Sequence, residues 1–138
     1  MTALARIFFR EYPTAPASAG AVIDWWESRR PIYNAAVAAT GLVTLGVVNV
    51  TFALPPSPAP VPWLVNVGAA LVYGVAMNVC YSAGWAAELG LRRWIDYHSG
   101  AVGAALFRYG FAFSIGLTIL PAGLATLVWL ARVARALL

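Results

Sequence analysis

The stretch "YNAAVAATGLVTLGVVNVTFAL", residues 33–54, decides the fold class, because it contains no formally charged side chain. A helix rises about 1.5 Å per residue, so this stretch is long enough to cross a hydrocarbon core of about 30 Å. The segment "PPSPAPVP", residues 55–62, follows directly, and its prolines cannot continue a helix. The pattern predicts a transmembrane helix over 33–54 that ends in an uncharged, proline-rich turn.

Two further apolar segments predict two further transmembrane helices, so we expect an all-α integral membrane protein with about three spans. The second helix is expected over 63–90, where it is longer than the bilayer is thick and should tilt or project into the cytoplasm. The third is expected over 107–131 and contains Pro121. Two separate helices on either side of this proline would each be too short to span, so we predict one kinked helix rather than a re-entrant pair.

The composition supports a membrane environment and argues against a nucleic-acid partner. Of the 138 residues, 62% are hydrophobic and 10% are charged, whereas soluble domains carry roughly 25% charged residues. The formal net charge is +4, but the arginines lie singly or in pairs beside apolar segments, as is typical of membrane flanks. With one cysteine and one histidine, the chain has no intramolecular disulfide, cysteine-based zinc site or bis-histidine haem.

The segment 1–30 is expected to form a cytoplasmic or interfacial arm in front of a transmembrane domain over 31–138. The apolar run "IFF" is too short for a secretory signal, and "PTAPASAG", residues 13–20, has the composition of a linker. Asp24, followed three residues later by Glu27, resembles a capping box and predicts a helix that begins at Asp24. Aromatic and basic pairs beside the spans are predicted to anchor them at the membrane interface: Trp25, Trp26, Arg29, Arg30, Arg92 and Arg93.

The distribution of arginines predicts the orientation of the chain. Four arginines precede the first predicted span and three lie between the second and the third, against two at the far end. Cytoplasmic loops carry an excess of basic residues. We therefore expect the N-terminus in the cytoplasm and the C-terminus outside.

The segment "NVCYSAGWAAELGLRRW", residues 78–94, holds the candidate binding residues. Asn78, Tyr81, Trp85 and Glu88 are three or four positions apart and fall on one stripe of a helix. The stripe should face another helix and pin the packing; the alternative is a site for a lipid headgroup, quinone or ion. Glu88 is expected to pair with Arg92, four residues further on, which weakens the case for a proton-carrying carboxylate.

Three other reactive side chains carry no site prediction. Cys80 lies off the stripe and is expected to be a small buried hydrophobic residue. His98 lies in a polar loop, where a solvated or capping histidine is expected rather than a ligand to a metal or pigment. Arg108 is expected to snorkel to the cytoplasmic headgroups, or else to pair with Asp96 or Glu88.

Small residues recur along the predicted helices and indicate close contacts within the chain or with a partner. They are Ala35, Ala39, Gly41, Gly46, Gly68, Gly74, Ala112 and Gly116.

The segments "DWWESRRPIYN", "NVCYSAGW" with Glu88, and "FRYGFAFSIGLTILPAG" together resemble a scattered group of small bacterial polytopic membrane proteins. These share a WWE…R..YN start, an N-x-CY-x-x-GW-x-x-E second helix and an LP in the third. The resemblance leaves out the N-terminal segment 1–20. It implies a bacterial protein with about three helices, and it implies no activity or catalytic residue.

The motif content favours a non-enzymatic role. The sequence contains no HExxH, Walker, GxSxG or CxxCH motif and no internal repeat of the transporter kind. We expect a non-catalytic accessory or structural subunit of a larger bacterial inner-membrane complex, respiratory or photosynthetic, whose partners are lipids and other membrane subunits. The alternatives are a binder or carrier of a lipid, quinone or pigment, and a membrane-tethered regulator whose N-terminal arm contacts a cytoplasmic partner. No metal and no resident cofactor are predicted.

Overall fold

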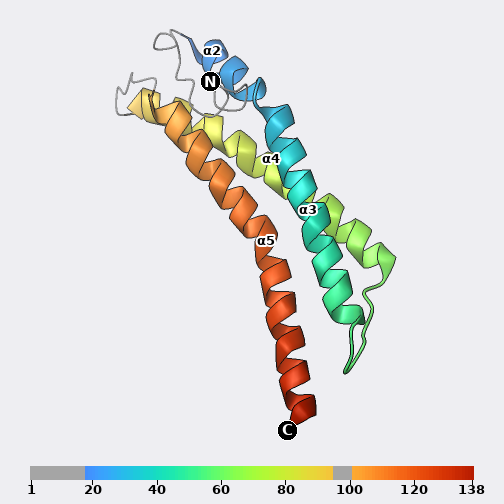
Figure 1. The fold of residues 1–138 in the computed structure, drawn as a ribbon. Helices are drawn as coiled ribbons and strands as arrows, with labels where there is room; N and C mark the ends of the chain where they lie inside the picture. The colour runs from blue at the N-terminus through green and yellow to red at the C-terminus, as the bar shows by residue number, and fades with distance from the viewer. Residues whose placement is uncertain (1–17, 95–100) are drawn as a thin grey trace, which may run out of the picture. The chain divides into compact units, whose positions relative to one another are not determined.

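The computed structural model describes residues 18–94 and 101–138, and all of the secondary structure in these ranges is helical (Figure 1). The helices are α2 (Ala19–Glu27), α3 (Arg30–Ala53), α4 (Trp63–Trp94) and α5 (Ala101–Leu137). The expectations for Asp96, for His98 and for the arm before residue 18 lie outside the described residues.

Three stretches are long and apolar enough to cross a membrane: Ala19–Ala53, Trp63–Trp94 and Val102–Leu137. At about 1.5 Å per residue, the 24 residues of α3 measure about 36 Å and the 32 residues of α4 about 48 Å. Both lengths exceed a hydrocarbon core of about 30 Å. The predicted all-α fold with three long apolar helices is confirmed.

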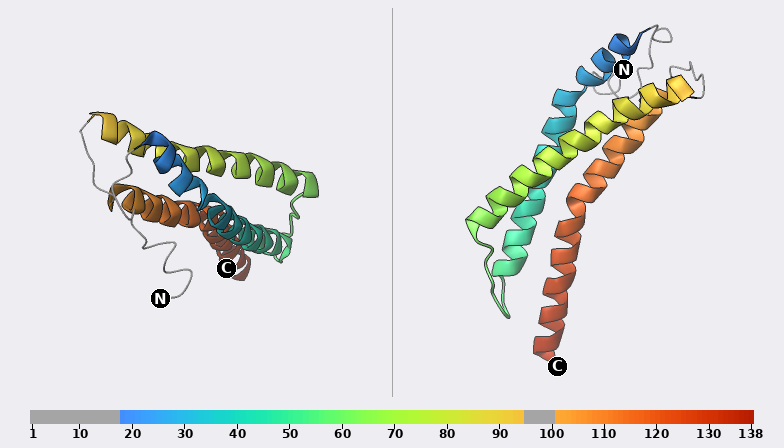
Figure 2. Two further views of the ribbon diagram at one scale, coloured as in Figure 1. Left: turned by 90° about the horizontal axis from the view of Figure 1, so that it is seen from above. Right: turned by 180° about the vertical axis from the view of Figure 1, so that it is seen from behind.

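The last helix passes through Pro121 without a break, which confirms one helix rather than a re-entrant pair (Figure 2). A proline is tolerated in a membrane helix because neighbouring groups can satisfy the freed backbone carbonyls. Both later helices are longer than predicted. Helix α4 continues past residue 90 to Trp94, and α5 begins at Ala101 rather than near Phe107.

The start of the first described helix differs from the sequence prediction. Ser18 is the N-cap of α2, and its hydroxyl accepts a hydrogen bond from the backbone N–H of Ala21 at 3.2 Å. Asp24 lies inside the helix and is exposed, so the prediction of an N-cap at Asp24 is wrong. The physical reason is that residues 19–23 already form a helical turn, and Ser18 caps it equally well.

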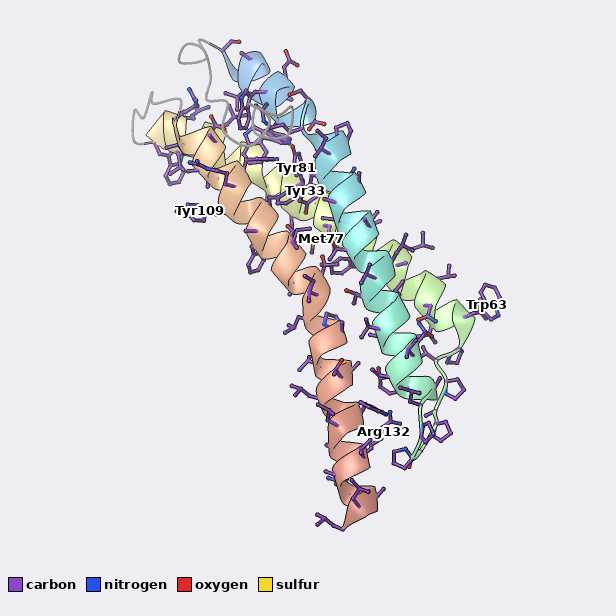
Figure 3. All side chains as sticks on the ribbon, viewed as in Figure 1. Tyr33, Trp63, Met77, Tyr81, Tyr109 and Arg132 are labelled. Atoms are coloured by element: carbon purple, nitrogen blue, oxygen red, sulfur yellow. The ribbon has the colours of Figure 1, made fainter. Side chains whose placement is uncertain are left out.

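The proline-rich turn between α3 and α4 is held by side chains of α5. Trp129 donates its indole N–H to the carbonyl of Pro55 at 3.0 Å, and the Arg132 guanidinium donates to the carbonyls of Thr51 and Ser57. Figure 3 shows Arg132 reaching from α5 toward this turn. The last carbonyls of a helix have no partner within it, and Arg132 supplies one to α3.

The chain divides into two compact units, which are described separately. Unit 1 joins the described residues up to Ala35 to Ala76–Phe113, and unit 2 joins Ala36–Val75 to Ser114–Leu138. Each unit therefore contains parts of α3, α4 and α5, and α2 belongs to unit 1.

Unit 2 is held by polar contacts between apolar helices. Thr118 of α5 accepts a hydrogen bond from Thr44 at its carbonyl, and its hydroxyl lies 2.7 Å from that of Tyr73. The amides of Asn49 and Asn66 bond to each other reciprocally at 2.9 and 3.2 Å. Such contacts between membrane helices contribute about 0.6 to 2 kcal/mol each.

Large apolar side chains are exposed on all three long helices, as a lipid environment requires. Among the most exposed are Leu42, Val43, Trp63, Leu71, Val72, Val75, Phe113 and Leu127. Cys80 is also exposed, so the prediction that it is buried is wrong. Of the predicted stripe on α4, Tyr81 and Glu88 are buried, and the exposed sides of this helix are largely apolar.

The glycines among the small residues that recur in the sequence have open space or ordinary contacts around them. A Cβ on Gly41 would lie 3.9 Å from the Thr118 side chain, whereas a Cβ on Gly46, Gly68 or Gly116 would meet nothing within 4 Å. The close approaches in the structure occur at two other glycines, which belong to the site described next.

Candidate functional site

Glu88 is the centre of a polar and aromatic cluster in unit 1. Its side chain is completely buried, with 0% of the residue exposed. One carboxylate oxygen, Oε1, accepts two hydrogen bonds from Arg92 at 2.7 and 3.1 Å, so the predicted pairing at a spacing of four residues is confirmed. The other oxygen, Oε2, accepts the indole N–H of Trp26 at 2.7 Å. A buried carboxylate requires partners of this kind, because removing a charge from water is costly.

Two glycines make room for this arrangement. A Cβ on Gly103 would lie 2.5 Å from Oε2 of Glu88, and a Cβ on Gly84 would lie 2.7 Å from the Trp26 ring. Real Cβ atoms do not approach other heavy atoms so closely. The carboxylate therefore packs on the bare backbone of α5, and the indole packs on the bare backbone of α4.

Aromatic rings surround the Trp26 indole. Tyr81 and Phe107 meet it edge to face, with ring centroids at 5.4 and 5.9 Å and interplanar angles of 78° and 75°. The Tyr81 hydroxyl donates to the backbone carbonyl of Trp26. Tyr33 stacks on Tyr81 at 4.6 Å and donates its hydroxyl to the carbonyl of Met77, and Figure 3 shows these three side chains together. Edge-to-face pairs contribute about 0.5 to 1.5 kcal/mol beyond the area that they bury.

Arg30 of α3 contacts Asn78, Tyr81 and Ser82 of α4. Its guanidinium forms a bidentate pair with Glu27 at 2.6 and 2.7 Å, and it donates to Asn78 at 3.2 Å and to Ser82 at 3.0 Å. It also lies 4.9 Å from the centroid of the Tyr81 ring. Arg30 is thus a bridge between α3 and α4 within unit 1, a role that its prediction as a membrane anchor did not contain.

The other predicted interface anchors have different surroundings. Arg29 is buried, with its guanidinium 3.7 Å from the centroid of Trp25 and a hydrogen bond to the Trp25 carbonyl at 2.8 Å. Trp26 is only 3% exposed, so its ring packs inside unit 1. Arg93 is exposed near the end of α4, as an anchor should be. Arg108 is exposed as well.

The four predicted stripe residues thus differ in their contacts. Tyr81 and Glu88 meet at Trp26, and Asn78 is joined to them through Arg30. Trp85 stands apart, since its buried indole N–H has no acceptor among the described residues. Asn78, Tyr81 and Glu88 thus bond to residues of α2 and α3.

Sequence reasoning missed the partner of Glu88 and the two glycines. A signal existed, because Glu88 is the one acidic residue between positions 28 and 95, and a buried indole N–H usually finds an acceptor. The 62 positions between Trp26 and Glu88 gave no local pattern that would pair them. Within the described residues, no group of three or more His, Cys, Asp or Glu side chains could hold a metal ion.

Comparisons with protein-family models, with curated proteins and with solved structures find no match to this chain.

Proposed function

We propose that this chain is a non-catalytic accessory or structural subunit of a larger bacterial inner-membrane complex, of the respiratory or photosynthetic kind. One contrast carries the proposal. The polar stripe is bonded within unit 1, whereas large apolar side chains are exposed on every long helix. Polar groups that bond inside a membrane protein hold its helices together. Exposed apolar faces suit lipid and neighbouring subunits.

The last helix supplies one face that suits a neighbouring helix. Gly116 of α5 is exposed, and a Cβ there would meet nothing within 4 Å. Phe113 and Leu120 nearby are also exposed. A bare glycine lets the backbone of a second helix approach closely, which is the usual way in which membrane helices pack without a hydrophobic driving force.

The N-terminus is placed in the cytoplasm in this proposal. The two arginines near the C-terminus are the main argument against it, because basic residues favour the cytoplasm. Arg132, however, donates to the carbonyls of Thr51 and Ser57. Its position therefore has a structural reason in unit 2 that is independent of the orientation of the chain.

Co-purification of a tagged chain from its native membrane tests the proposal, with Gly116→Leu as the informative variant. Because the site is open in the chain itself, leucine should leave the fold intact and block a partner helix, so the larger subunits should be lost. Gly116→Ala keeps the residue small and should retain them. Equal retention of the same subunits by both variants would remove this face from the proposed contact, and the absence of any larger subunit with the unmodified chain would contradict the proposal itself.

A further inference from the structure

We propose that the socket filled by Trp26 is a binding site for a planar aromatic molecule with a ring N–H, and that α2 is a strap that keeps it closed. The Trp26 socket is defined by Tyr81, Gly84, Glu88 and Phe107. The inference does not depend on the proposed function. It concerns the position that the Trp26 side chain occupies inside unit 1.

The carboxylate of Glu88 is held in place independently of Trp26. It is completely buried, and Arg92 of the same helix holds Oε1 by two hydrogen bonds. The charge and position of the carboxylate therefore have support that does not come from α2. Oε2 accepts the Trp26 N–H at 2.7 Å, so the group that it selects is a ring N–H donor.

The walls of the socket select a flat ring. Tyr81 and Phe107 meet the indole edge to face, and the backbone at Gly84 lies so close to the six-membered ring that a Cβ would be 2.7 to 2.8 Å from two of its carbons. A bulky aliphatic group would collide with this backbone. An indole or a similar fused N–H heterocycle has the required thickness and places its donor toward the carboxylate.

Helix α2 has the construction of a strap. Both ends of its nine residues are capped by neighbouring side chains. Ser18 accepts from Ala21 at the start, and Arg29 donates to the Trp25 carbonyl at the end. Ser28 and Arg29 lie outside both α2 and α3, so a movement of α2 as a body would change the backbone at these two residues and break the bond from Tyr81 to the Trp26 carbonyl. A ligand in the socket would replace the bond from Trp26 to Glu88.

The test uses the full chain in lipid nanodiscs, with indole as the probe and protein-free discs as the baseline. Trp26→Ala empties the socket, so indole should bind it saturably and at least about tenfold tighter than it binds the unmodified chain. The reference probe 1-methylindole has nearly the same shape but no N–H, and it should bind at least about tenfold more weakly, as expected for one hydrogen bond to a charged group. Adding Gly84→Leu to Trp26→Ala refills the socket and should abolish binding.

Opening of the strap is measured in the chain that retains Trp26. Spin labels attached at Ala21→Cys on α2 and Ala87→Cys on α4, both exposed positions, report their separation in a Cys80→Ser background. Saturating indole should lengthen this distance. The proposal is overturned if folded Trp26→Ala does not bind indole, if 1-methylindole binds equally well, or if the label distance stays constant at saturating indole. The distance measurement decides alone if Trp26→Ala does not fold.

Discussion

Glu88 illustrates how much of unit 1 depends on single residues. Its two oxygens go to different helices, one to Arg92 on α4 and one to Trp26 on α2. Breaking such a pair by removing one partner usually costs more than the pair itself contributes, because the other polar groups stay buried without it.

Replacing Glu88 with leucine should lower the stability of the chain by about 3 to 5 kcal/mol, since Arg92 and the Trp26 N–H both lose their acceptor. Glu88→Gln should cost less, because the amide oxygen can still accept the indole N–H. Thermal or chemical denaturation in detergent micelles measures both variants. A Glu88→Leu variant as stable as the unmodified chain would show that neither hydrogen bond matters.

Gly103→Ala should destabilise the chain by about 1 to 3 kcal/mol, because the new methyl group would lie 2.5 Å from Oε2 of the buried carboxylate. Gly90→Ala and Gly68→Ala are matched controls, since a Cβ at either position meets nothing within 4 Å. Alanine is the better helix former by about 1 kcal/mol, so the controls should be neutral or stabilised. The same denaturation assay gives the sign, and a stabilised Gly103→Ala variant would refute the close packing.

Among the helices, the three spans could be predicted from the sequence, but most of the contacts that join them could not. Long segments without charged residues predicted the spans, and the prolines at 55–62 predicted the turn, because both features are local in the sequence. On α4, Tyr81 and Glu88 of the predicted stripe are buried, whereas Cys80, which lies off the stripe, is exposed and its predicted burial was wrong.

The candidate site was likewise predictable only in part. The stripe and the Glu88–Arg92 pair follow from helical spacing. The contacts of α2 do not, because they join residues that are far apart along the chain and depend on two glycines whose role shows only in three dimensions.

The turn between α3 and α4 should loosen when Arg132 is replaced. Arg132→Gln removes the donor to Thr51 and Ser57, so amide exchange at Ala59, which donates to the Phe52 carbonyl at 2.8 Å, should become faster. Hydrogen–deuterium exchange of the 54–62 peptide measures this, and Arg135→Gln, an exposed arginine on the same helix, is the control. Identical exchange in both variants would mean that Arg132 does not hold the turn.

For the whole molecule, the orientation proposal predicts opposite locations for the two ends. A reporter fused to the N-terminus should be active in the cytoplasm and one fused to the C-terminus should be active outside. Arg132→Gln should leave this pattern unchanged, because it is set by the four arginines up to Arg30 and by the three at positions 92, 93 and 108. A C-terminal reporter that is active in the cytoplasm would contradict the orientation.

Whether this chain is a subunit of a larger membrane complex is decided by what purifies with it. A tagged chain is purified in a mild detergent from its native membrane, and its partners are identified by mass spectrometry together with an absorption spectrum. We expect larger membrane subunits at a fixed stoichiometry, with the haem or pigment bands of a bioenergetic complex. A chain that elutes alone or as a homo-oligomer, without those subunits, would contradict it.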